Sequence, residues 1–131
     1  MAKQFQPADL RHFRYLSWPM LNAAGSRVAY VMKTPEEESG DHIPQVRWID
    51  LASGAEYELP QGTHSPCFMA DDTTLIYISA QSGEDQVWQK NLASGEEKQL
   101  TTLRHGVLRY ALSADEKKLA VEATLWRADV E

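Results

Sequence analysis

His64 and Ser65 are adjacent in the sequence, and a hydroxyl beside an imidazole is the pair from which a nucleophile and its general base are built. The remaining histidines, His12, His42 and His105, stand apart from this pair. His64 and Ser65 lead directly into the first strand of a predicted repeat. We therefore expect them to have a structural role and not a catalytic one.

A second group of residues could bind a hard cation, because Ca²⁺ and Mg²⁺ prefer carboxylate oxygens. This group consists of Glu36, Glu37, Glu38, Asp41 and His42. A run of charges in a loop bounded by glycine and proline is usually just solvated. We therefore expect no metal site there.

Cys67 is the single cysteine of the chain and lies between apolar residues, which is typical of a small core residue and not of a reactive thiol. The sequence contains no Gly-x-Ser-x-Gly elbow, no Gly-rich phosphate loop, no His-Glu-x-x-His motif and no pair of cysteines. We assign no catalytic, cofactor-binding or metal-binding residue to this chain, and we expect no cofactor.

Charge and hydropathy narrow the classes of partner. The 131 residues carry a net charge of -6 and have an isoelectric point near 5.2, which disfavours nucleic acid, because phosphate binding requires a basic surface. No apolar run approaches the roughly 20 residues needed to cross a bilayer, so we expect no membrane partner. The first ten residues lack the apolar core of a secretory signal. With one cysteine no intrachain disulfide can form, and we expect a cytoplasmic location.

The elements that would position these residues form a repeat. The tetrapeptide Leu-Ala-Ser-Gly occurs at 51–54 and again at 92–95. An apolar strand is predicted upstream of each copy, at 27–32 and 74–79, and a third such segment lies at 118–123. Aligning these segments gives a unit of about 41 to 47 residues, a period typical of repeat architectures.

Each unit has the same internal plan. A turn of small and acidic residues precedes the apolar strand, which in the first two units is apolar at successive positions, as expected when both faces are buried. A further strand, at 46–51 or 87–92, ends in a hairpin turn with glycine as the expected residue of positive φ. A more polar outer strand follows at 55–60 or 96–101. Four short antiparallel strands per unit predict the blades of a β-propeller, with a plain antiparallel sandwich as the alternative.

We therefore predict an all-β chain, a partial β-propeller of about two and a half to three four-stranded antiparallel blades. Residues 1–15 form a lead-in, in which Asp9 caps a short helix. Residues 16–60 form the first blade, 64–101 the second, and 107–131 an incomplete third. Closed propellers typically have about 4 to 8 blades. Either the chain is a fragment of a longer protein, or it closes by self-association.

The repeat resembles the TolB-like blades of prolyl oligopeptidase family serine peptidases. The resemblance is carried by the turn and strand that end in Val-Ala-Tyr or Leu-Ile-Tyr, and by the hairpin that contains Leu-Ala-Ser-Gly. Segment 9–32 is similar to the start of the acylaminoacyl-peptidase branch. The turn at 22–26 lacks the usual Asp, and the turn at 69–73 lacks the usual Gly. Trp48 and Trp88 lie at different distances from the next Leu, which predicts a β-bulge in one blade.

The resemblance implies a propeller that covers a C-terminal α/β-hydrolase domain and restricts access to short peptides, N-acylated ones included. The hydrolase domain and these peptides would be the partners, and this chain would carry no catalysis. The alternative is a stand-alone propeller module for protein or peptide binding that closes by homodimerisation. In either case four tryptophans are expected to pack within the blades: Trp18, Trp48, Trp88 and Trp126.

Overall fold

The computed structural model describes residues 4, 6, 13–36 and 38–126. This part of the chain contains ten strands and no helix, and therefore no helix that could span a membrane. The all-β prediction is confirmed. The strands are β1 (Tyr15–Leu21), β2 (Arg27–Pro35), β3 (His42–Asp50), β4 (Glu56–Glu58), β5 (His64–Phe68), β6 (Thr74–Ser79), β7 (Gln86–Asn91), β8 (Glu97–Gln99), β9 (Arg109–Leu112) and β10 (Leu119–Glu122).

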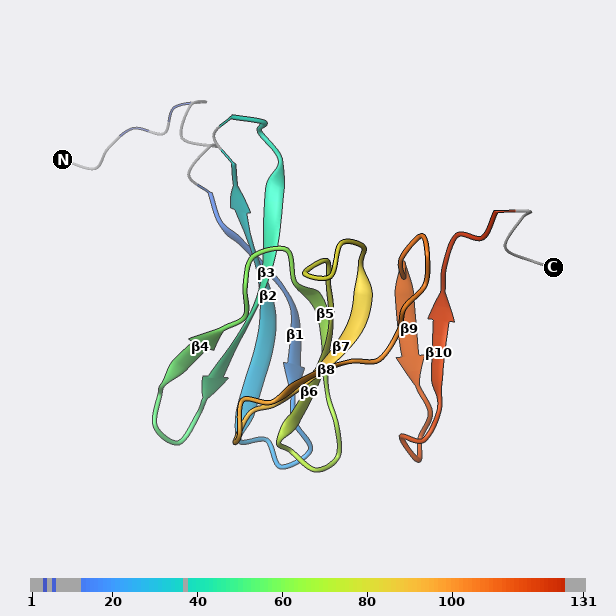
Figure 1. Cartoon of the computed structure of the whole chain (residues 1–131). Helices are drawn as coiled ribbons and strands as arrows, with labels where there is room; N and C mark the ends of the chain where they lie inside the picture. The colour runs from blue at the N-terminus through green and yellow to red at the C-terminus, as the bar shows by residue number, and fades with distance from the viewer. Residues whose placement is uncertain (1–3, 5, 7–12, 37, 127–131) are drawn as a thin grey trace.

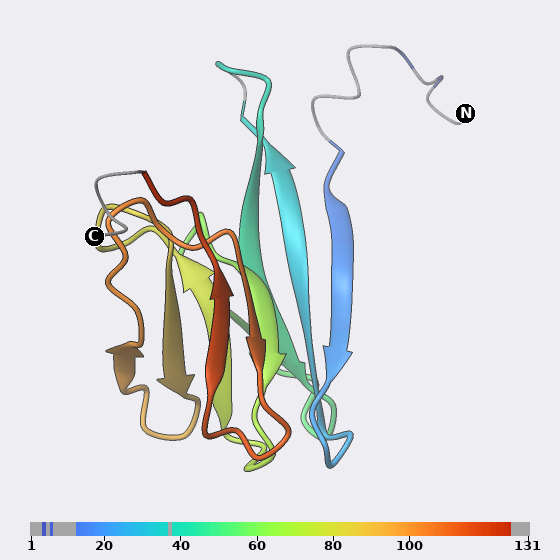
Figure 2. The same ribbon diagram turned by 90° about the vertical axis from the view of Figure 1, so that its right-hand side faces the viewer.

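The strands form three antiparallel sheets that lie side by side in chain order (Figure 1). The first sheet has the order β1-β2-β3-β4, the second β5-β6-β7-β8, and the third pairs β9 with β10. Each sheet is therefore a meander in which neighbours in sequence are neighbours in space. The β2–β3 hairpin extends beyond the adjacent sheets, as Figure 2 shows.

The turn that joins the first two strands of each sheet is held by side-chain oxygens. Asn22 Oδ1 accepts two backbone N–H groups at 2.8 and 2.9 Å, and Asp71 Oδ1 does so in the second sheet at 3.0 and 2.8 Å. In the third sheet Asp115 and Ser113 each accept one, at 3.1 and 2.9 Å. The aspartate missing from the first turn is therefore replaced by Asn22, because an amide oxygen accepts the same bonds.

The same turns contain one residue of positive φ: Gly25 (68°), Asp72 (60°) or Glu116 (61°). The glycine expected in the second turn is absent, and Asp72 adopts the left-handed conformation in its place. The carboxylates gain a contact that glycine cannot make. Asp72 Oδ1 accepts the Ala24 N–H at 3.0 Å, and Glu116 accepts the Ala70 N–H at 3.1 Å. Each acid thus joins its sheet to the preceding one.

The two Leu-Ala-Ser-Gly segments form equivalent hairpin turns. Gly54 and Gly95 have φ of 74° and 79°, and their N–H groups donate to Asp50 O and Asn91 O at 2.7 Å. The side chains of Asp50 and Asn91 each accept two further turn N–H groups. The prediction that glycine supplies the positive φ in these hairpins is confirmed.

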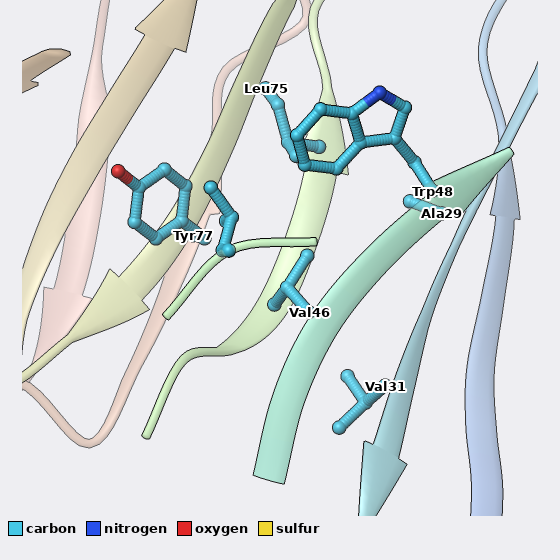
Figure 3. Close-up of a cluster of buried hydrophobic side chains, with 7 residues drawn as sticks. Ala29, Val31, Val46, Trp48, Leu75 and Tyr77 are labelled. Carbon is cyan, nitrogen blue, oxygen red and sulfur yellow. The ribbon is translucent and has the colours of Figure 1, made fainter. Parts of the chain in front are cut away.

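Apolar side chains from facing sheets meet in two layers. In Figure 3 the residues of β2 and β3 lie opposite Leu75 and Tyr77 of β6. This first layer contains Ala29, Val31, Val46, Trp48, Leu59, Leu75 and Tyr77, with Phe68, Trp88 and Leu92 packed against it. The second layer, between the second and third sheets, contains Ile76, Ile78, Val87 and Val107. Burial of these side chains is the main force that holds the sheets together.

The different spacing of Trp48 and Trp88 from the following Leu does not come from the predicted bulge. The β2–β3 and β6–β7 ladders run without interruption, so the bulge predicted from Trp48 and Trp88 is wrong. A shift of one residue reverses the face of a side chain. Trp48 extends from the first sheet toward the second, and Trp88 extends from the second sheet toward the first, so both pack in the first layer.

The prediction that the apolar strand of each unit is buried on both faces is confirmed for β6 but not for β2. Every residue of β6 is buried. In β2, Ala29 and Val31 are buried against the second sheet, whereas Val28 and Tyr30 are only half-buried. Neither of the two buried apolar clusters of the described residues includes Val28 or Tyr30. The continuous apolar pattern of β2 therefore fits a further neighbour that this segment does not supply.

The helical lead-in is not found. Asp9 lies outside the described residues, but Tyr15 and Leu16 belong to β1 and pair with Lys33 and Met32. The antiparallel ladder satisfies backbone groups that a helix would have satisfied internally, so the helix prediction is wrong at this end. In the third sheet only two strands are described, and residues 127–131 lie outside the described part.

Candidate functional site

The first strands of the three sheets, β1, β5 and β9, surround a cavity of about 260 Å³. We call it the apolar cavity. β1 and β5 are edge strands of their sheets, so part of their backbone N–H and C=O groups lacks a ladder partner. The lining residues are Trp18 and Met20 from β1, Ser65, Pro66 and Cys67 from β5, and Arg109 and Tyr110 from β9.

Two of these strands are interrupted at the same place. The β1–β2 register shifts between Ser17 and Met20, and the β5–β6 register shifts between His64 and Cys67. Each interruption contains a residue of positive φ before a proline: Trp18 at 58° and Ser65 at 56°. Proline has no N–H to donate, which confines it to edges and bulges of a sheet. The bulge turns the residue before the proline toward the cavity.

Tyr110 closes the apolar cavity on the side of β9. Its hydroxyl donates to Ser65 O at 2.5 Å, and Ile76 O lies 3.2 Å away. Burial, followed by the nearby Cys67, raises the pKa of Tyr110 far above its ordinary value of 10.0. The phenol therefore stays protonated and acts as a hydrogen-bond donor that fixes the Ser65 bulge.

A second cavity of about 240 Å³ adjoins the first, because Trp18 and Ser65 line both. We call it the basic cavity, since it carries Lys33 and His64 and no carboxylate among its lining residues. Its other lining residues are Ser17, Val31 and Pro44. Trp18 therefore borders both the apolar cavity and a cavity that carries the Lys33 ammonium.

The structure brings a carboxylate to the His64–Ser65 pair. His64 Nδ1 lies 2.9 Å from Ser65 Oγ, and His64 Nε2 lies 3.5 Å from Asp85 Oδ2. A serine, an imidazole and a carboxylate in line are the parts of a nucleophilic triad. The sequence analysis missed Asp85, because nothing in the sequence near it indicates that its loop reaches β5.

The arrangement nevertheless lacks what acyl transfer requires. In nucleophile elbows the residue after the serine donates its N–H to the oxyanion, but here that residue is Pro66, which has no N–H. Asp85 is 44% exposed and beyond hydrogen-bonding distance of the ring. His64, Ser65 and Asp85 therefore fit a structural contact between β5 and the loop before β7.

Among the described residues of the acidic loop, no cluster of three or more His, Cys, Asp or Glu is found that could hold a metal ion. Glu36 accepts the Ser39 hydroxyl at 2.6 Å, and the His42 ring lies edge-on to Tyr15 at 5.1 Å. Glu37 lies outside the described residues. The Glu36 carboxylate is therefore used within the turn of this loop.

Cys67 is half-buried and lines the apolar cavity. Burial, followed by the charge of Glu116, raises its pKa above the ordinary value of 9.0. A raised pKa means little thiolate at neutral pH, and the thiolate is the reactive form. The thiol therefore contributes surface to the cavity and not a nucleophile.

The tryptophans divide into two pairs. Trp48 is buried and Trp88 packs in the same layer, as the sequence predicted. Trp18 is 60% exposed at the cavities, and Trp126 is 62% exposed and stacks on His105 at 4.6 Å. The prediction of packing within the blades is therefore wrong for Trp18 and for Trp126. The signal that could have found it is the aligned pair Trp18-Pro19 and Ser65-Pro66, 47 positions apart.

Four-stranded antiparallel meanders stacked through apolar layers define the chain as a segment of a β-propeller. Neither a known protein-family pattern nor the sequence of a curated protein matches it. Solved structures do. The chain is similar to the acylaminoacyl peptidase of Pyrococcus horikoshii, with a TM-score of 0.69 at 19% identity.

That match covers 83% of this chain and 17% of the peptidase. The β-propeller domain of the Trilobed protease from Pyrococcus furiosus gives a TM-score of 0.66 at 19% identity, covering 83% of this chain and 33% of that one. A puromycin-hydrolysing peptidase of Mycobacterium tuberculosis gives 0.65 at 19% identity, covering 82% and 18%. The resemblance to the propeller of this peptidase family is confirmed at the level of the fold.

Proposed function

We propose that this chain is the N-terminal part of the propeller of a serine peptidase of the prolyl oligopeptidase family. In this role it filters access of short peptides, N-acylated ones included, and contacts a C-terminal α/β-hydrolase domain. It carries no catalytic residue itself. The blades are residues 16–60, 64–101 and 107–131, and the location is cytoplasmic.

The observation that carries the proposal is the wall formed by β1, β5 and β9. The blades of a propeller are arranged around a central channel, and here the first strands of the three sheets together surround the apolar cavity. The chain spans 17% of the acylaminoacyl peptidase that it resembles, so the rest of a ring and a hydrolase domain are needed to complete the proposed function. The half-exposed face of β2 fits a further blade of such a ring.

The test begins with the coding sequence beyond the codon for Glu131. We expect further blades and then a Gly-x-Ser-x-Gly elbow followed in order by Asp and His. The complete product should hydrolyse short peptide anilides, whereas a variant with alanine at the elbow serine should not. The Ser65→Ala variant of the same product should still turn over peptide, in contrast to the elbow variant, because Ser65 is not the nucleophile.

An open frame without an elbow would refute the peptidase assignment. So would a complete product that cleaves no short peptide after correct folding has been established by circular dichroism. A product that cleaves long unfolded proteins as readily as short peptides would refute only the filtering role.

The half-buried face of β2 also fits the alternative of a stand-alone module that closes by homodimerisation. The first sheet leaves the face with Val28 and Tyr30 half-buried, while the equivalent Leu75 and Tyr77 are covered by the preceding sheet. A second copy could cover this face. Light scattering after size exclusion decides: a homogeneous dimer of twice 14.8 kDa supports the alternative, and a monomer or a heterogeneous mixture contradicts it.

A further inference from the structure

Trp18 combines two unfavourable features. It holds φ at 58°, a conformation that costs every residue except glycine some free energy, and its side chain is 60% exposed. Ser65 occupies the equivalent position in β5, and its carbonyl receives the Tyr110 hydroxyl. The fold thus requires a left-handed residue at this bulge, but it does not require an indole. Strained residues of this kind cluster at ligand sites.

The surroundings of the indole define what it would bind. Trp18 lines the apolar cavity together with Met20, Pro66 and Tyr110, and it also lines the basic cavity together with Lys33 and His64. Among the charged groups near these walls, Asp85 faces His64 and Glu122 holds Arg109 at 2.6 Å. The exposed Lys33 ammonium is therefore the cation best placed to receive an anion.

We propose that the Trp18 bulge is a binding site for the C-terminal residue of a peptide that ends in a large apolar side chain. The side chain enters the apolar cavity against Trp18, and the free carboxylate lies in the basic cavity near Lys33. The two cavities, of about 260 and 240 Å³, together suit such a short bipartite ligand. The exposed edges of β1 and β5 leave backbone groups that can pair with an extended peptide.

This inference deepens the proposed function, because it names the peptide class that the channel wall would select. It needs no catalysis and can be tested on the 131-residue chain. The probes are acetyl-Ala-Phe with a free carboxylate, the same peptide as its C-terminal amide, and acetyl-Ala-Gly with a free carboxylate. Binding is followed by ¹H–¹⁵N chemical-shift changes during titration.

The acid that ends in Phe should bind saturably, with the largest shifts at Trp18, Lys33 and Ser65. The amide and the Gly-terminated peptide should each bind roughly three- to tenfold more weakly, because each lacks one of the two contacts. Trp18→Gly should weaken binding of the Phe acid at least roughly tenfold. Lys33→Gln should remove the preference for acid over amide.

Trp18→Gly is the informative variant, because glycine accepts the left-handed φ at no steric cost. The variant should fold as well as the original chain, so lost binding cannot be attributed to unfolding. Matched controls are Trp126→Ala, which removes an equally exposed indole, and Lys117→Gln, which removes an exposed ammonium elsewhere; neither should change the affinity.

Absence of saturable binding to the wild-type chain would overturn the inference, and so would equal affinity for acid and amide or unchanged affinity in Trp18→Gly. These outcomes are independent of the peptidase test. A complete product with peptidase activity and a KM unaffected by Trp18→Gly would refute only the Trp18 site. A chain that binds the acid but belongs to a protein without a hydrolase domain would refute only the proposed function.

Discussion

Asp72 offers the sharpest test of how the sheets are joined. Its carboxylate accepts the Ala24 N–H of the preceding sheet at 3.0 Å, and its backbone has φ of 60°. The left-handed conformation costs about 1 kcal/mol for a residue such as Asp. A hydrogen bond from a partly exposed backbone N–H to a carboxylate contributes about 1 kcal/mol in return. The two terms nearly cancel.

Three substitutions separate the two terms. Asp72→Ala keeps the strained backbone and loses the bond, so we expect it to lower the free energy of unfolding by about 1 kcal/mol. Asp72→Gly also loses the bond but relieves the strain, so it should lie within about 0.5 kcal/mol of the original chain. Asp72→Asn keeps an acceptor oxygen and tolerates the left-handed region, so it should also be close to neutral.

The assay is urea unfolding followed by circular dichroism, with the m-value compared among variants to ensure that the same transition is measured. Ser94→Ala serves as a control for the loss of a hydrogen bond within one turn, because Ser94 Oγ accepts the Glu96 N–H at 3.2 Å inside the same exposed hairpin. Equal stability of Asp72→Ala and Asp72→Gly would refute the argument, since it would mean that the backbone at this turn carries no strain.

Three further perturbations test the core, the turns and the thiol. Leu75→Ala removes a fully buried side chain from the first layer and should lower the free energy of unfolding by about 2–5 kcal/mol, whereas Leu51→Ala, at a 51% exposed position, should change it by less than about 0.5 kcal/mol in the same urea titration. Burial alone would raise the pKa of Asp71, but hydrogen bonds from Thr74 and Thr73 hold it below its ordinary value of 3.8. A carboxylate with a lowered pKa stabilises the fold above that value, so the stability advantage of the original chain over Asp71→Asn should be complete near pH 6 and should shrink as the pH falls below 3.8. A stability difference that does not change with pH would contradict this expectation. Burial raises the pKa of Cys67, so iodoacetamide at pH 7.5 should alkylate the native chain more slowly than the urea-unfolded chain; equal rates would show that the thiol is not protected.

The repeat was predictable because short, local sequence motifs encode its turns. Gly54 and Gly95 occupy the positive-φ position that their hairpins require, and the alignment of the two copies follows from them. The sequence shows that the turns at 22–26 and 69–73 depart from the family pattern, but it does not show which side chains replace the missing residues. That Asn22 substitutes for the missing aspartate depends on the direction of a side chain two positions earlier, which spacing alone does not give.

The candidate site was not predictable as a whole, since its residues come from strands of all three sheets, which only the stacking of the sheets brings together. Asp85 approaches His64 from a loop 21 positions away. Lys33 and His64 share a cavity through the packing of β2 beside β5. The hydrophobic periodicity of the sequence does not predict such contacts, because they depend on how one sheet packs on the next.

The bulges of β1 and β5 show how a feature of the fold can be separated from a feature of the site. Both strands have a left-handed residue before a proline, so the bulge itself follows from the repeat and needs no functional explanation. What differs is the residue. At Ser65 the bulge is fixed by the Tyr110 hydroxyl, whereas at Trp18 a strain of about 1–2 kcal/mol is combined with an exposed indole. A glycine at this position would relieve the backbone strain, and burial of the indole would gain hydrophobic free energy. At position 18 the residue is not glycine and the indole is not buried. A bound ligand that covers the indole would supply the missing term, which is why Trp18→Gly should fold at least as well as the original chain and should bind the Phe-terminated acid at least roughly tenfold more weakly.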